Sequence, residues 1–202
     1  MSFLNLDWRP EFGAIFTWWA MDRFGNVAVM VNNGWGDIPR VLRENDQLEE
    51  GLDHLGEYIW EESPLFSTYP EHKGGGVQID MYSAYLYRGY SGGRPDVEKR
   101  LMDQFAKPGT ISDVSLAINK GLYVYHAIEG TLPGEDYPVG YDGPSKMGDY
   151  YRHVIPTIRA TVDDIPEQYR QFVAQSDAVS FESDRLLDGA LIDRLFPSIV
   201  PE

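Results

Sequence analysis

Two apolar runs on either side of a short polar turn constrain the fold of this chain more than any other feature. Residues 13–22 and 27–33 are rich in aromatic and β-branched side chains, which predicts two strands of an antiparallel hairpin. Because both faces of each run are apolar, we expect each strand either to be covered on two sides or to lie centrally in the sheet. Asp22, Arg23 and Asn26 are expected to be solvated side chains of the turn.

A helical pattern follows at residues 46–60. Its apolar residues recur at i, i+4, i+7 and i+11 and fall within roughly 60° of one another on a helical wheel. Acidic residues repeat with the same spacing on the opposite side. The apolar set is Leu48, Leu52, Leu55 and Ile59, and the acidic set is Asp46, Glu50, Asp53 and Glu57. We therefore expect the apolar set to be buried and the acidic set to be exposed.

The rest of the chain mixes strands with helices. The patterns predict strands at 121–128 and at 150–162, and Pro156 interrupts the second strand or places it at an edge. They predict helices at 95–105 and 163–174 and one or two short helices at 184–196. A loop is expected at 63–76 and an exposed connection at 131–148, and the segment 77–90 fits a helix or a strand about equally well. No composition break or repeat divides the chain. We expect one α+β domain over residues 1–202, with a mostly antiparallel sheet and several packed helices.

Charge and composition exclude several classes of function. The chain has 32 acidic against 17 basic residues and a formal charge of −15, which opposes binding to nucleic acid. It contains no cysteine, so disulfides, thiolate metal sites and cysteine nucleophiles are excluded. Its N-terminus lacks the pattern of a secretory signal, and its longest apolar stretch has about half of the roughly 20 residues that cross a bilayer. We expect a cytoplasmic protein without membrane contact.

The search for catalytic motifs is mostly negative. The glycine-rich segments lack the spacing of phosphate-binding loops, and no GxSxG or HExxH motif occurs. The separation of Glu50 and His54 permits a shared metal ion, although an incidental salt contact is the commoner outcome. His126 and Glu129 face opposite sides if the strand continues through both. We therefore expect no catalytic residue, no metal and no cofactor.

Aromatic residues leave two alternatives open. Tyr82, Tyr85, Tyr87 and Tyr90 lie close together in the sequence, and tyrosine rings stack on sugars or anchor protein partners. The first alternative is a hydrolase that uses two carboxylates in an aromatic-lined cleft. The second is a carbohydrate- or ligand-binding module. A deep pocket with converging polar groups would favour either one over a protein-binding surface.

The acidic helix is the least ordinary feature. Eight acids and one base lie between Arg43 and Glu62, opposite the stripe that should be buried. One interpretation is a solvated face that aids solubility. The other is a docking face for a basic protein, because complementary charge speeds encounter and selects partners. The candidate partner-binding residues are Asp46, Glu50, Asp53, Glu57, Glu61 and Trp35.

Two segments carry a resemblance to known proteins. Residues 18–39, with the sequence WWAMDRFGNVAVMVNNGWGDIP, resemble an opening motif of uncharacterised bacterial proteins, and residues 120–128 with 150–166 resemble their later GLYVY and proline-containing patterns. In its general character, small, acidic and α+β, the chain is similar to immunity proteins of bacterial polymorphic toxin systems. The resemblance implies a cytoplasmic protein that neutralises a basic toxin or nuclease, and it assigns no site residue.

Overall fold

The predicted hairpin forms the middle of the sheet in the computed structural model, which describes residues 3–62 and 72–201. Strands β1 (Thr17–Met21) and β2 (Val27–Val31) pair antiparallel, with Trp19 opposite Val29. Trp18 and Trp19 are both fully buried, although they point to opposite faces of β1. The sheet is therefore covered on both faces, as the apolar runs predict.

An eight-stranded mixed sheet carries the fold, in the order β10-β8-β1-β2-β5-β7-β3, with β9 also paired to β7. The pairs β1–β8 and β2–β5 are parallel, and the other pairings within the described residues are antiparallel. The remaining strands are β3 (Val77–Ile79), β5 (Tyr123–Ala127), β7 (Tyr150–Pro156), β8 (Val173–Gln175), β9 (Leu186–Leu187) and β10 (Ser198–Ile199). Strands β4 (Tyr82–Ser83) and β6 (Pro138–Val139) form a separate pair. The α+β class with a mostly antiparallel sheet is confirmed.

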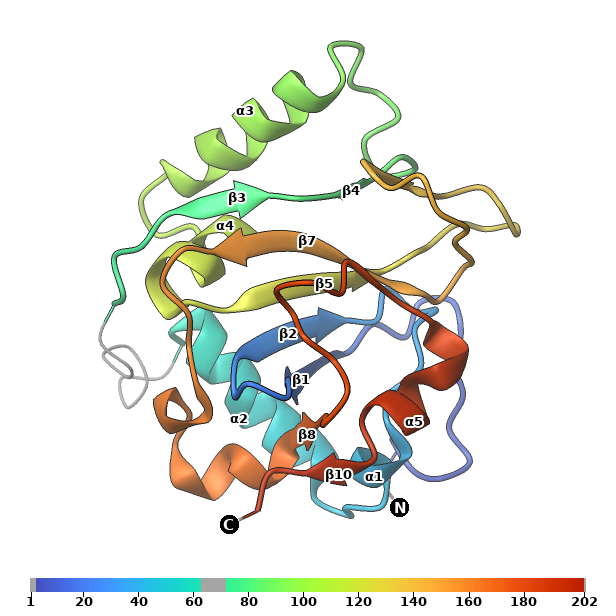
Figure 1. Ribbon diagram of the computed structural model, residues 1–202, viewed down its shortest axis with the longest axis vertical. Helices are drawn as coiled ribbons and strands as arrows, with labels where there is room; N and C mark the ends of the chain where they lie inside the picture. Colours follow the sequence, from blue (N-terminus) through green and yellow to red (C-terminus); the bar gives the residue numbers. More distant parts are fainter. Residues whose placement is uncertain (1–2, 63–71, 202) are drawn as a thin grey trace.

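Different parts of the chain cover the two faces of the sheet. On one face, the Trp18 indole donates a hydrogen bond to the Tyr150 hydroxyl at 2.9 Å and packs edge-on against Phe196, which belongs to the C-terminal segment. Figure 1 shows this segment crossing in front of the sheet. On the other face, Trp19 packs against Tyr58 of helix α2 (Leu48–Trp60). The central hairpin is thus packed between the C-terminal segment and α2.

The other helices are short, apart from α3 (Arg94–Phe105), which begins with Pro95 in its first turn. They are α1 (Arg40–Arg43), α4 (Asp113–Ser115) and α5 (Ile192–Leu195), the π-helix η1 (Leu116–Lys120), and the 3₁₀ helices η2 (Val162–Asp164), η3 (Glu167–Phe172) and η4 (Gly189–Leu191). No helix of the described residues is long and apolar enough to span a membrane.

Three local predictions need correction or completion. The helix expected at 163–174 is instead η2 and η3 followed by strand β8, which pairs with β1. The segment 184–196 contains strand β9 before its short helices. The ambiguous segment 77–90 provides β3 and β4. The loop expected at 63–76 lies outside the described residues over 63–71.

The hairpin turn is also less solvated than expected. Asp22 is 1% exposed, and its carboxylate accepts hydrogen bonds from the backbone N–H groups of Phe24, Asn26 and Phe181, each at 2.9 Å. Asn26 is buried as well, whereas Arg23 is exposed. The prediction was wrong for Asp22 and Asn26 because the distant segment around Phe181 packs on the turn, and the Phe181 N–H donates a hydrogen bond to the Asp22 carboxylate.

Candidate functional site

Helix α2 separates its apolar and acidic residues as the spacing predicts. Leu48, Leu52, Leu55 and Ile59 are buried, and Tyr58 joins them against the sheet. On the opposite side, Asp46, Glu50 and Asp53 are exposed, and the side chain of Glu57 is 42% exposed. We call Asp46, Glu50, Asp53 and Glu57 the acidic row. The predicted burial of one face and exposure of the other is confirmed, with Glu57 more covered than the rest.

The acidic row has little internal compensation. Within residues 3–62 and 72–201, its ion-pair contacts are two long ones to the His54 imidazole, at 3.9 Å from Glu50 and 3.8 Å from Glu57. An imidazole is charged only when it is protonated. No lysine or arginine of these same ranges lies within ion-pair distance of the row. The row therefore presents its negative charge to solvent.

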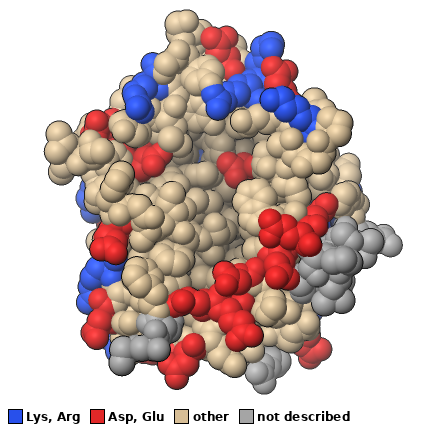
Figure 2. Space-filling model, turned by 180° about the vertical axis from the view of Figure 1, so that it is seen from behind, with Lys and Arg blue, Asp and Glu red and all other residues tan. Residues whose placement is uncertain are grey.

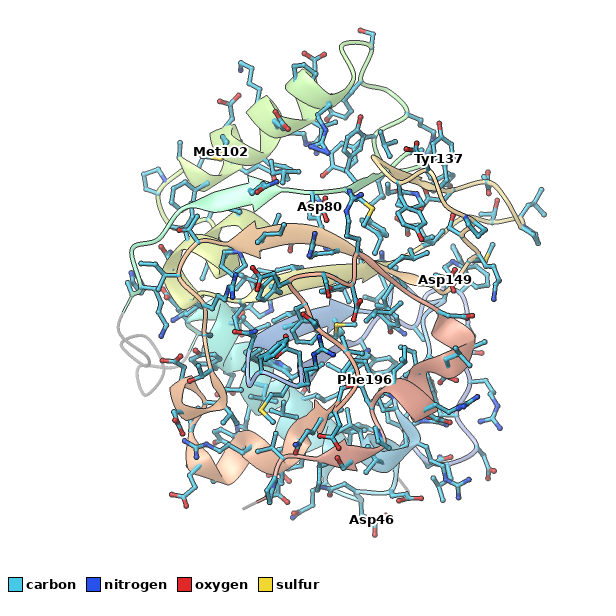
Figure 3. All side chains as sticks on the ribbon, in the orientation of Figure 1. Asp46, Asp80, Met102, Tyr137, Asp149 and Phe196 are labelled. Atoms are coloured by element: carbon cyan, nitrogen blue, oxygen red, sulfur yellow. The ribbon has the colours of Figure 1, made fainter. Side chains whose placement is uncertain are left out.

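The shape and charge of the surrounding face are visible from behind the molecule. Figure 2 shows acidic side chains in a band across the part of this face formed by α2, while lysine and arginine gather at the end that carries α3. The face is hollowed between these two regions. In Figure 3, Asp46 lies at the outer edge of the molecule, away from the sheet. A partner approaching this face meets charge of one sign along α2.

Glu61 does not belong to the exposed part of this surface. It ends α2 in a left-handed conformation and accepts contacts from Lys120 Nζ and His72 Nε2, both at 2.9 Å. Burial opposes ionisation of Glu61, but the hydrogen bonds from Lys120 and His72 outweigh it and hold the pKa of this carboxyl below its usual range. The structure therefore occupies Glu61 with intramolecular partners.

Trp35 is not brought together with the acidic row. It follows β2, is half-buried, and packs against Phe12 with 6.3 Å between the ring centroids. Its carbonyl oxygen lies close to Gly148, near the start of β7. Neither of these contacts involves a residue of the acidic row.

Trp60 is the aromatic residue that lies beside the acidic row. Its side chain is 48% exposed at the end of α2, and it lines a cavity of about 420 Å³ with Phe105, Pro108 and Ile111. The spacing could have shown this, because at about 100° per residue Trp60 falls roughly 40° from Asp46 on the helical wheel. The sequence alone counted Trp60 among the possible anchors but favoured Trp35, because Trp35 borders a glycine-rich loop.

A second group of titratable side chains lies on the same face of the sheet as α2. The Asp113 carboxylate, at the start of α4, accepts a hydrogen bond from His126 Nε2 at 3.0 Å and lies 3.7 Å from His153 Nε2. His153 Nδ1 is 2.6 Å from the Met81 carbonyl oxygen. The pairing of β5 with β7 shifts register between Val124 and Tyr125, opposite His153. This irregularity places the two imidazoles with their ring centroids 5.2 Å apart.

The surroundings of this group shift its pKa values in different directions. Burial opposes ionisation of Asp113, but the charge and hydrogen bond of His126 and the charge of His153 outweigh it and lower the pKa of the Asp113 carboxyl to about 2. Burial lowers the pKa of His153. Burial and the nearby Asp136 raise the pKa of Glu129, whose Oε1 is buried and has no hydrogen-bond partner among the described residues. Asp113 is therefore the ionised carboxylate of the group, and Glu129, which follows β5, is a carboxyl that holds its proton more readily than usual.

Sequence reasoning found parts of this group but not its arrangement. His126 and Glu129 were recognised as a pair, and the strand ends at Ala127, between them. Asp113 and His153 gave no signal, because they come from elements 40 residues apart that only the folded sheet brings together. Within the part of the chain that the structure describes, no three or more His, Asp or Glu side chains are grouped so that they could hold a metal ion. Glu50 and His54 likewise make only a long salt contact.

Comparisons of this chain with protein-family models, with curated proteins and with solved structures find no match.

Proposed function

We propose that this protein binds a basic protein through the acidic row and neutralises it, in the manner of an immunity protein against a toxin or nuclease. The observation that carries the proposal is the row itself: Glu50, Asp53 and Glu57 lie on one face of α2, and Asp46 lies in the turn before it. Three of these carboxylates are exposed and Glu57 is partly exposed, and none has a lysine or arginine partner within the described residues. Exposed charge of one sign is the ordinary means by which a protein steers a partner of opposite charge.

The chemistry of the partner follows from that charge. A nuclease or another phosphate-binding toxin needs cationic groups around its active site, because these groups hold the phosphates of its substrate. An acidic surface that covers such a site competes with the substrate for the same cations. The charge of −15 on the whole chain adds attraction at long range, although salt screens it beyond about 8 Å at physiological ionic strength.

Trp60 gives this surface an anchor that charge alone does not provide. Half-exposed tryptophans are frequent among the residues that contribute most to binding energy, because a large rigid ring buries apolar area at small entropic cost. Trp60 stands at one end of the acidic row, beside the 420 Å³ cavity. We therefore assign it to the docking surface. Trp35 stays a prediction, and Glu61 is left out because Lys120 and His72 occupy it.

The proposal makes the protein an inhibitor and not an enzyme, and it places the encounter in the cytoplasm. A chain without cysteine is compatible with that reducing compartment. No cofactor, metal ion or nucleic acid takes part in the proposed activity.

The test is a triple variant that removes three negative charges of the row, Glu50→Gln, Asp53→Asn and Glu57→Gln. Its partner in the assay is a basic protein domain chosen from the products of the neighbouring genes. Association rates are recorded at two salt concentrations. We expect slower association and a weaker dependence of the rate on salt, because steering by exposed charge acts mainly on the association step. The dissociation rate should change less.

A matched control separates the acidic row from overall charge. Glu11→Gln, Asp142→Asn and Asp177→Asn remove three exposed acids outside α2 and bring the charge from −15 to the same −12. This control should keep most of the salt dependence. An unchanged rate and salt dependence in the α2 variant, or an equal loss in both variants, would contradict a docking role for the row.

A second candidate function is favoured by the opposite pKa shifts of Asp113 and Glu129. Two carboxyl groups whose surroundings drive their pKa values apart can act as base and acid in the hydrolysis of a glycosidic bond. Asp113 has the lowered pKa and Glu129 the raised one. Burial raises the pKa of the nearby Tyr151, and the charges of Asp113 and Glu129 add to that rise. A neutral sugar is the substrate class that suits an acidic protein.

This second candidate has its own test. Neutral aryl glycosides report hydrolysis directly by the colour of the released phenol. Asp113→Asn should then lower the rate by about a hundredfold or more, because it removes the group that works as base or nucleophile. If the wild-type protein hydrolyses these substrates no faster than Asp113→Asn does, this function is ruled out. The protein-binding proposal is then unaffected.

A further inference from the structure

A small cavity lies beside the acidic row, between α2 and η3. It measures about 180 Å³ and is lined by Glu50 and His54 of α2 and by Tyr169 and Gln171 of η3, among others. Pockets that hold drug-sized molecules are larger, about 300 Å³ or more. The cavity therefore suits one side chain of a partner better than a free small molecule.

Close packing of the two helices explains why the cavity is there. A Cβ atom added to Gly51 would collide with the ring of Phe172, so only glycine allows η3 to approach α2 this closely. Glycine weakens a helix, but Gly51 is required at this contact. The rings of His54 and Tyr169 stack beside it with their centroids 5.1 Å apart and an angle of 30° between the planes.

The walls of the cavity combine three kinds of group. Glu50 contributes a carboxylate that is 72% exposed, so it reaches the mouth of the cavity. Tyr169 contributes an aromatic ring, and Gln171 contributes an amide with a hydrogen-bond acceptor. A carboxylate, an aromatic face and an amide oxygen together match a planar cation that donates several hydrogen bonds.

We infer that this cavity receives the guanidinium group of an arginine side chain of the basic partner, an inference that rests on the proposed function. The guanidinium is flat, stacks on aromatic rings and forms paired hydrogen bonds with a carboxylate. A lysine ammonium is a compact point charge and uses the aromatic wall less well. The acidic row then attracts the partner, and the cavity selects the side chain that enters.

The experiment uses Nα-acetyl-arginine methylamide as the probe and follows the side-chain NMR signals of His54 and Tyr169. Parallel titrations use the lysine analogue and the citrulline analogue, which has the shape of arginine without its charge. We expect arginine to bind more tightly than lysine and citrulline to leave the signals in place. The order of the first two separates recognition of a guanidinium from attraction of any cation.

Two single variants on the same helix provide the matched comparison. Glu50→Gln removes the carboxylate that lines the cavity, and Asp53→Asn removes an exposed carboxylate that does not. Glu50→Gln should weaken arginine binding about tenfold, as expected for the loss of a charged hydrogen-bond partner. Asp53→Asn should change it by less than about twofold, because charge at a distance is screened. Both positions are exposed, so neither variant threatens the fold.

The possible failures are distinguishable from one another. Equal weakening by the two variants, or equal shifts with arginine and citrulline, would overturn the inference about the cavity and leave the docking role of the acidic row standing. Arginine binding that depends on Glu50, together with partner association that ignores the α2 triple variant, would overturn the proposed function and leave a guanidinium site. Absence of any arginine-induced shift would overturn the inference directly.

Discussion

The acidic row and Asp80 carry the same kind of charge in opposite surroundings. The side chains of the row lie on the outer side of α2, where water solvates their carboxylates. Asp80 is 7% exposed and lies inside the molecule (Figure 3), where it meets Arg152 Nη2 at 2.7 Å and Arg185 Nη2 at 2.6 Å. The interior carboxylate is fully engaged by arginines, whereas the exterior ones are left available.

This difference indicates that the acids that stabilise the fold and the acids available to a partner are separate sets. A buried charge is costly unless it is paired, so each interior acid must be matched by its neighbours. An exposed charge costs little, and removing it changes stability little. Acids that the fold does not need are therefore the ones that can serve a partner. Four experiments test this difference between the interior and the exterior acids. They follow from the largest expected change in stability to the smallest.

The largest effect is expected for Asp80→Asn. The change leaves the guanidinium of Arg152, which is 4% exposed, without its carboxylate partner. Breaking a buried ion pair from one side costs about 3–5 kcal/mol of folding free energy. Urea unfolding of the variant and of Glu50→Gln measures the contrast, since Glu50→Gln is the same type of change at an exposed site and should shift stability by less than about 0.5 kcal/mol. Similar losses in both variants would break the comparison.

The pairing of Asp113 with the two histidines should make the stability of the protein depend on pH. Its carboxyl pKa falls from the usual 3.8 to about 2 in the folded state. A carboxyl with a lowered folded pKa adds stability above its unfolded pKa and loses it as pH falls through the folded value. The contribution, about 2 kcal/mol, should therefore disappear between about pH 4 and pH 2. Unfolding free energies of the wild type and Asp113→Asn, measured from pH 5 to pH 2, should converge over that window, and parallel curves would contradict the pairing.

The two glycines of α2 extend the contrast to the two sides of one helix. Gly51→Ala forces a methyl group against the ring of Phe172 and should lower stability by about 1–3 kcal/mol. Gly56→Ala meets nothing within 4 Å and should raise stability by about 0.5–1 kcal/mol, because alanine favours the helix. Thermal unfolding of both variants gives the signs, and a gain at both positions would show that α2 and η3 can move apart.

The smallest effect on stability is expected for the triple variant of the acidic row. Glu50→Gln, Asp53→Asn and Glu57→Gln should change the unfolding free energy by no more than about 0.5 kcal/mol, with a slight gain at low salt where like charges on one helix repel. The gain should vanish at high salt as screening removes the repulsion. A loss above about 1 kcal/mol would mean that the row supports the fold and is not free for a partner.

The elements whose apolar residues repeat regularly along the sequence were predicted correctly. The hairpin and α2 were predictable because their apolar residues repeat with the period of a strand or a helix over many residues. Residues 173–175 were not, because acids and a proline upstream favour a helix while pairing with β1 makes them a strand. Asp22 was assigned to solvent for the same reason, since its burial depends on Phe181, far along the chain.

The candidate sites follow the same division. The acidic row was predictable because Glu50, Asp53 and Glu57 lie on a single helix and Asp46 lies just before it. The same helical wheel places Trp60 beside them. The grouping of Asp113 with His126 and His153 was not predictable, because it requires α4, β5 and β7 to meet and depends on the irregular pairing between the two strands. The arginine-sized cavity depends on the approach of η3 to α2, which no single segment encodes.

The parallel pairing of β1 with β8 has a consequence for synthesis of the protein. β1 is complete after residue 21, but the strand that covers its outer edge begins at residue 173. While the ribosome makes the intervening chain, the hairpin keeps an apolar strand with unpaired backbone groups at its edge. Nascent chains stopped before residue 173 should therefore recruit chaperones or aggregate, and full-length chains should fold slowly because closure waits for the last part of the polypeptide.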